Sequence, residues 1–160
     1  MSTLPELLEE DVQEIESALK DFLAKSEATL ALVTAEGGFL IVKQGDSEKY
    51  DSTTLGALAS NAFSAAQAIG NITGETTFTH IYQQGDKSSL LVSDIDGHNT
   101  MVVVFPSSVS VGIVKYYATP TVAAISAQFS KAMQRPTNRG IDLAMLNLPD
   151  SSVLFQQKSA

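Results

Sequence analysis

Residues Ser52 to Gly74, STTLGALASNAFSAAQAIGNITG, contain no Asp, Glu, Lys or Arg. The stretch opens with the capping residues Ser, Thr and Thr, and it closes with Gly70, Asn71 and Gly74, which are typical of helix ends. Alanine is frequent between these signals, and larger apolar residues recur along the stretch. The pattern predicts one helix without a charged side chain.

A helix that covers only its own protein's core normally keeps a charged outer side. The 52–74 helix has none, so we expect the chain's own sheet on one side and a partner on the other. In the alternative interpretation the helix is internal and turns an uncharged polar stripe to solvent. That stripe consists of Ser60, Asn61, Ser64 and Gln67.

The 160 residues predict one domain, over 1–135, followed by a C-terminal tail, over 136–160. No cysteine is present, which excludes disulfides and thiolate metal sites. The net charge of −8 argues against binding of nucleic acid or of anionic membranes, because both need a basic surface. An acidic protein can still dock on a basic patch of another protein.

The first residues, MSTLPELLEEDVQE, are acidic and do not have the charge pattern of a secretory signal. No apolar run approaches the length of about 18 residues that a membrane-spanning helix needs. We therefore expect a cytoplasmic protein without membrane insertion.

The segment before the uncharged helix predicts a helix and a hairpin. Thr3 to Glu6 has the form of a capping box, and the apolar spacing that follows predicts a helix over 4–25, with a start nearer Leu8 as the alternative. Strands are expected over 29–34 and 39–43, joined by a Gly-Gly turn.

The segment after the uncharged helix predicts three strands and a helix. The strands cover 76–82, 88–93 and 100–105, and the last is apolar on both faces, as a central strand is. Residues 108–134 combine β-prone composition with helical periodicity, and we expect one long helix kinked at Pro120. The element order is helix, two strands, helix, three strands, helix, which predicts an α/β sandwich with a five-stranded antiparallel sheet.

Residues that could support catalysis are few. His80 lies in a predicted strand and His98 in a turn, and neither belongs to a nucleophile or metal motif. Asp94 and Asp96 are best explained as the acidic end of a strand before a β-turn. No P-loop is present. We therefore expect no enzymatic activity, no metal and no cofactor.

Several local motifs then point to one family. They are Thr34–Leu40 in the hairpin, Thr54–Leu55 with Leu58–Ala59 and Ser60–Asn61–Ala62 in the uncharged helix, Tyr82–Asp86, and Val102–Phe105 followed by Val111–Lys115. Together they resemble the Roadblock superfamily, and within it bacterial MglB-type proteins, over about Glu9 to Met133.

The resemblance implies a Roadblock-like sandwich that forms homodimers by pairing the third strands edge to edge. The middle helices then lie side by side as a platform for one Ras-like GTPase, MglA, whose GTP hydrolysis MglB-type proteins stimulate without an arginine finger. By position, the helix pair or the GTPase contact is lined by Leu55, Leu58, Ala59, Ala62, Phe63 and Ala66. The strand expected to pair across the dimer carries Phe78, His80 and Tyr82.

Three hypotheses follow for the function. The first is a homodimeric activator of a small Ras-like GTPase. The second is a Roadblock scaffold that recruits or localises partners without activating them. The third, a small-molecule sensor, lacks convergent polar anchors. The apolar cluster from Ile141 to Leu148 in the tail is either a docking segment or a segment folded back on the domain.

Overall fold

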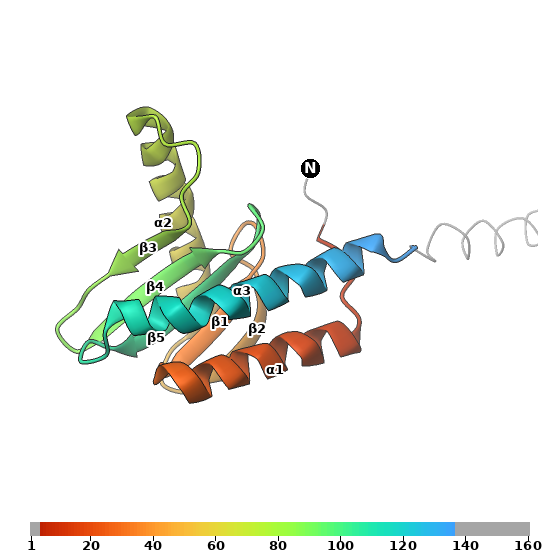
Figure 1. The fold of residues 1–160 in the computed structure, drawn as a ribbon, viewed down its shortest axis with the longest axis horizontal. Coiled ribbons are helices and arrows are strands. Elements are labelled where there is room, and N and C mark those ends of the chain that lie inside the picture. The colour runs from red at the N-terminus through yellow and green to blue at the C-terminus, as the bar shows by residue number, and fades with distance from the viewer. Residues whose placement is uncertain (1–3, 137–160) are drawn as a thin grey trace, which may run out of the picture.

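The computed structural model describes residues 4–136, and the structural statements below concern these residues. It confirms the predicted element order (Figure 1). The elements are α1 (Glu9–Ser26), β1 (Leu30–Thr34), β2 (Leu40–Gly45), α2 (Ser52–Thr73), β3 (His80–Gln83), β4 (Ser88–Asp94), β5 (Thr100–Pro106) and α3 (Val111–Gln134). The tail predictions for 137–160 lie outside the described residues.

The five strands form one antiparallel sheet in the order β2-β1-β5-β4-β3. The prediction of a central strand is confirmed, because β5 occupies the middle of the sheet and is buried from Thr100 to Phe105. The two outer positions belong to β2 and β3. The sheet therefore ends, on one side, in the short strand β3.

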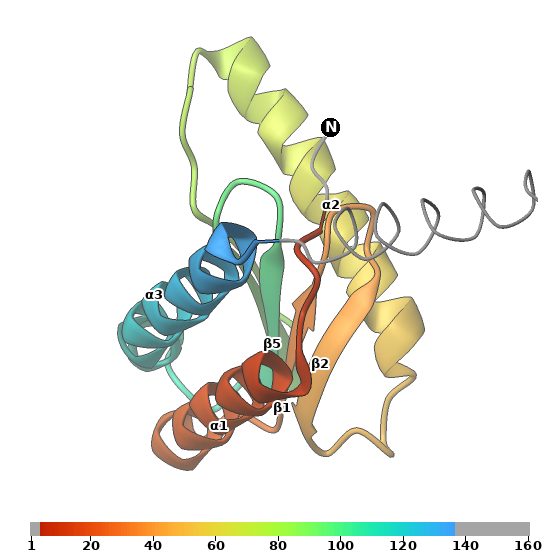
Figure 2. The ribbon, with the colours of Figure 1, turned by 90° about the vertical axis from the view of Figure 1, so that its right-hand side faces the viewer.

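Helices cover both faces of the sheet: α1 and α3 lie on one face, and α2 crosses the other (Figure 2). Side chains along each strand point alternately to the two faces of the sheet, so the strands contribute to a hydrophobic core on each face. Phe105 packs with Phe22 and Ile125 on the α1 and α3 side, whereas Val102 packs with Phe63 on the α2 side. The three layers confirm the expected sandwich.

Helix α1 begins at Glu9 rather than at residue 4. The backbone nitrogen of Leu8 donates a hydrogen bond of 2.8 Å to the buried carboxylate of Asp11, and this contact closes the first turn of the helix. The prediction over 4–25 therefore started too early, and the alternative start near Leu8 agrees with the structure. Pro5 lies in the segment before the helix.

Helix α3 runs through Pro120 as a single element, as the helical period of 108–134 predicted. Proline removes one backbone donor from a helix. On either side of it, the hydroxyl groups of Thr119 and Thr121 donate hydrogen bonds to the carbonyl oxygens of Lys115 and Tyr117, at 2.9 and 3.0 Å.

Strand β3 begins at His80, so it is shorter than the predicted strand over 76–82. The preceding residues, from Glu75 to Thr79, connect it to the end of α2, which projects beyond the sheet (Figure 1). The β-branched residues that predicted a longer strand therefore belong to this connection.

Candidate protein–protein interface

Helix α2 is long, uncharged and attached to the sheet mainly by its N-terminal half. The side chain of Asp51 caps it by accepting a hydrogen bond from the Thr54 backbone nitrogen. At Gly56 an added Cβ would lie 2.9 Å from Thr34 Cγ2, so glycine lets the helix approach the sheet closely. The buried side of α2 is formed by Ser52, Gly56, Ala59, Ser60 and Phe63.

The six residues predicted to contact a partner do not share one side of α2. Ala59 and Phe63 are buried in the core between α2 and the sheet. Leu55 and Ala66 are half-buried, whereas Leu58 and Ala62 are exposed. The structure therefore leaves Leu58 and Ala62 open to a partner, and it places Ala59 and Phe63 in the protein's own interior.

An apolar stripe runs along the exposed part of α2. The side chains of Leu58 and Ile69 are each 62% exposed and that of Ile72 is 87% exposed. The stripe, here called the seam, consists of Leu55, Leu58, Ala62, Ala65, Ile69 and Ile72. Its members follow one another in alternating steps of three and four residues. This is the spacing of helices that pack side by side.

The sequence predictions did not include Ala65, Ile69 and Ile72. The alternating spacing was the signal that could have identified them, because it separates the seam from the residues facing the sheet. The side chains of Ile69 and Ile72 are exposed to water in the single subunit.

The opposite flank of α2 is polar. Ser60, Ser64 and Gln67 line a small cavity of about 70 Å³ together with residues of the β1–β2 and β4–β5 turns. Successive helical residues turn by about 100°, so the seam lies on the other flank. Between the two flanks, pointing away from the sheet, lie the exposed side chains of Asn61 and Ala68, here called the crest.

Strand β3 offers an open edge of the sheet. Among the described residues it pairs with β4 alone. His80 Nδ1 lies 2.9 Å from Ser93 Oγ on β4, and burial, together with the positive charge of Lys115, lowers the pKa of His80. Both effects favour the neutral form of the imidazole at this edge.

The three residues predicted at the dimer interface lie on two faces of the sheet. Phe78 precedes β3 and stacks on Phe63 beneath α2, with ring centroids 4.9 Å apart. Tyr82 stacks on Phe105 on the other face, with ring centroids 6.1 Å apart. A regular strand over 76–82 would place these side chains on one face, but β3 begins only at His80, so Phe78 lies outside the strand.

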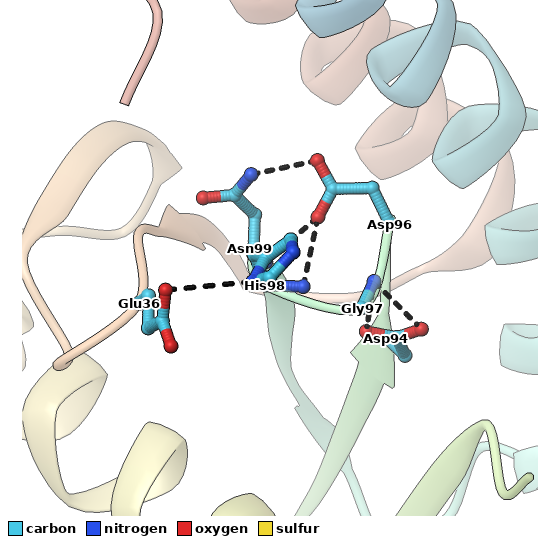
Figure 3. Close-up of polar contacts among 6 residues, drawn as sticks. All are labelled: Glu36, Asp94, Asp96, Gly97, His98 and Asn99. Carbon is cyan, nitrogen blue, oxygen red and sulfur yellow. Dashed lines mark hydrogen bonds and ion pairs between the residues drawn. The ribbon is translucent and has the colours of Figure 1, made fainter. Parts of the chain in front are cut away.

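The acidic residues before β5 organise a turn (Figure 3). Asp94 accepts hydrogen bonds from the Gly97 backbone nitrogen, and Asp96 accepts them from the backbone nitrogens of His98 and Asn99. His98 Nδ1 lies 3.4 Å from a carboxylate oxygen of Glu36, which links this turn to the β1–β2 turn. Burial raises the pKa of Asp94.

The described part of the chain has neither a metal-type cluster nor a membrane-type helix. Within residues 4–136 no three His, Cys, Asp or Glu side chains form a group that could hold a metal ion. None of the helices there is long and apolar enough to span a membrane. The features that stand out are thus the seam, the crest and the open edge of β3.

Comparison with known proteins agrees with this architecture. The family model of the Roadblock/LC7 domain matches residues 14–105. No curated protein sequence matches the chain. Among solved structures, Myxococcus xanthus MglB is 21% identical, with a TM-score of 0.75 over 82% of this chain and 98% of that one.

Two further solved structures have the same fold. The gliding protein MglB from Thermus thermophilus is 22% identical, with a TM-score of 0.74 over 82% of this chain and 99% of that one. A structure described as MglB with tetrameric arrangement is also 22% identical, with a TM-score of 0.75 and the same coverage.

Proposed function

Because this chain belongs to the Roadblock/LC7 family, we propose that it is a homodimeric regulator of a small Ras-like GTPase of MglA type. In this proposal it activates GTP hydrolysis by binding the GTPase and contributes no catalytic residue of its own. The observation that carries the proposal is the uncharged α2, which has an apolar seam on one flank and a free crest.

Two features support a homodimer. The open edge of β3 can pair with the β3 of a second copy about a two-fold axis, which extends the sheet and brings both α2 helices to one face. Ala62 and Ala65 allow close approach of the two helices, and the larger seam residues lose their contact with water. The seam therefore accounts for apolar side chains that a monomer exposes.

The crest offers a surface to which a second partner can bind. Asn61 and Ala68 point away from the sheet, so pairing along the seam leaves them accessible. Binding to an uncharged surface does not require the removal of water from charged side chains. A platform of this kind acts by binding one switch conformation of the GTPase more tightly than the other.

The position of arginine fits activation without an arginine finger. Within residues 4–136 the one arginine is Arg135, and both of its terminal nitrogens bond to Asp11 on the α1 and α3 side of the sheet. It is therefore engaged away from α2. The catalytic groups in this proposal belong to the GTPase.

The test is single-turnover GTP hydrolysis by an MglA-type GTPase with and without this protein. We expect faster hydrolysis with the wild-type chain and loss of the effect in Ala68→Glu. Ser130→Glu, an exposed substitution on α3, is the matched control and should retain the effect. An unchanged rate with retained binding would instead support the scaffold hypothesis, and absence of binding would contradict both.

A further inference from the structure

Two adjoining cavities lie between the polar flank of α2 and the β4–β5 turn. The smaller has a volume of about 70 Å³ and the larger has a volume of about 500 Å³. Gln67, Asp94 and Gly97 line both cavities, which together are here called the polar cleft. The larger cavity is also bounded by Asn71 of α2 and by the connection over residues 75–79.

The polar cleft contains carboxylates without a cationic partner. Asp94 is half-buried and Glu75 is exposed, and within residues 4–136 neither forms an ion pair. The imidazole of His98 beside the cleft is already paired with Glu36, at 3.4 Å (Figure 3). A carboxylate that has lost part of its water is stabilised by an opposite charge. The cleft is therefore complementary to a cationic group.

A buried hydroxyl group at the cleft is also without a partner. Ser60 is only 7% exposed and lines the smaller cavity. Its backbone carbonyl accepts a hydrogen bond from Ser64, but its own hydroxyl group makes none among the described residues. Buried polar side chains are normally hydrogen-bonded. A polar group that enters the cleft can supply the missing hydrogen bond.

The chemistry of the walls fits a guanidinium group. A guanidinium carries a positive charge and five N–H donors, and it can bond to several acceptors at once. The cleft offers carboxylate oxygens, the Ser60 hydroxyl group and the side-chain amide oxygens of Gln67 and Asn71. Phe78 adds an apolar wall to the larger cavity and is held there by its stacking on Phe63. The methylene stem of an arginine can pack on such a wall.

The cleft lies directly beside the crest. Gln67 in its wall precedes Ala68 of the crest, and Asn71 follows Ala68 by less than one helical turn. The seam lies on the other flank of α2, so pairing along the seam leaves the cleft open. Resting on the proposed function, we propose that the polar cleft receives an arginine side chain of the partner that binds the crest.

This contact gives the neutral surface of α2 a direction. An uncharged crest can bind a partner, but it has no charge that selects one orientation. Carboxylates along one flank attract a basic side chain to that flank and so fix the register of the complex. The crest then supplies contact area, and the cleft supplies orientation.

The first test uses a small probe and no GTPase. N-acetyl-arginine amide is titrated into the full chain, and the side-chain amide signals of Gln67 and Asn71 are followed by NMR. N-acetyl-citrulline amide, which has nearly the same shape and no charge, is the matched control. We expect saturable shifts with the arginine compound only, and their loss in the double variant Asp94→Asn with Glu75→Gln.

The double variant removes charge with little change in shape. Asparagine at position 94 keeps a side-chain oxygen that can accept the hydrogen bond from the Gly97 backbone nitrogen, and position 75 is exposed. Circular dichroism checks that the variant is folded. The absence of shifts, or equal shifts with the arginine and citrulline compounds, would overturn the proposal.

The second test identifies the source of the arginine. The affinity for an MglA-type GTPase is measured for the wild type, for the double variant and for Asp46→Asn with Glu48→Gln. The last variant makes the same change in net charge at exposed positions before α2. We expect binding at least about tenfold weaker, and less sensitive to salt, in the cleft variant alone.

The two tests separate the two proposals. Equal affinity of the cleft variant and its control would show that the partner inserts no arginine into the cleft, and would overturn this inference while the proposed function stands. Failure of the wild type to bind the GTPase would contradict the proposed function, whereas the probe titration still decides whether the cleft binds a guanidinium.

Discussion

Asp11 and Arg135 join the start of α1 to the end of α3 by two hydrogen bonds of 2.6 Å each, although 124 positions separate them in the sequence. The Asp11 carboxylate also accepts hydrogen bonds from the Gln128 side chain and from the Leu8 backbone nitrogen. Its side chain is fully buried. The pair therefore closes the layer formed by the two helices.

Arg135→Leu should destabilise the fold. It leaves the buried Asp11 carboxylate without its cationic partner, which costs about 1–3 kcal/mol for a polar group that loses a partner in the interior. Thermal unfolding followed by circular dichroism measures the change. Arg135→Lys should recover only part of the stability, because lysine does not form the paired hydrogen bonds of a guanidinium. An unchanged midpoint for Arg135→Leu would contradict this role.

The same pair predicts how stability depends on pH. The Arg135 guanidinium holds the pKa of Asp11 well below its ordinary value of 3.8. A lowered folded-state pKa stabilises the fold above the ordinary value, and this stabilisation is lost as the pH falls through 3.8 toward the folded-state value. Asp11→Asn should therefore be less stable than wild type at pH 7, with the difference shrinking on acidification.

Denaturant titrations of both proteins between pH 7 and pH 2.5 measure this dependence. Comparison with Asp11→Asn isolates the contribution of this carboxylate from those of the other acids. A stability difference that stays constant over the whole range would show that the ionised form of Asp11 is not preferentially stabilised.

Phe63→Ala tests whether Phe63 belongs to the core or to a partner contact. The side chain is 3% exposed and stacks on Phe78, so its truncation should lower the free energy of unfolding by about 3–5 kcal/mol. Chemical denaturation at a low protein concentration, where a dimer dissociates, measures it in the single subunit. A loss that appeared only at high concentration would place Phe63 in an interface instead.

Ala65→Glu and Ser64→Glu test the seam. Both positions are exposed and adjacent in sequence, but Ala65 lies in the seam and Ser64 on the polar flank. A charge buried between two α2 helices is strongly unfavourable, so Ala65→Glu should give a monomer and Ser64→Glu a dimer. Size-exclusion chromatography with light scattering distinguishes them. If both variants form dimers of equal stability, the seam is not part of the dimer interface.

Much of the fold could be predicted because local signals agreed with the tertiary structure. The Gly-Gly turn before Phe39 joins the predicted hairpin, and the doubly apolar run of β5 lies at the centre of the sheet. The start of α1 was misplaced because a distant residue decides it. Asp11, which closes the first turn, is held in place by Arg135.

The candidate site was only partly predictable. The absence of charged residues identified α2 as a candidate interface helix. It did not indicate which side of the helix faces the sheet, because Ala59 and Ala62 are both alanine and yet one is buried and the other exposed. Contacts with β1 and β5 bury one and leave the other exposed. The start of β3 depends on how far α2 extends beyond the sheet. The β-propensity of single residues carries no information about that extension.

We propose that the outward side of α2 binds a Ras-like GTPase in one nucleotide state. The most direct test of this proposal is the affinity of the immobilised protein for an MglA-type GTPase loaded either with a non-hydrolysable GTP analogue or with GDP. We expect tighter binding of the GTP-analogue form and loss of that preference in Ala68→Glu. Equal affinity for the two forms, or no binding of either, would contradict it.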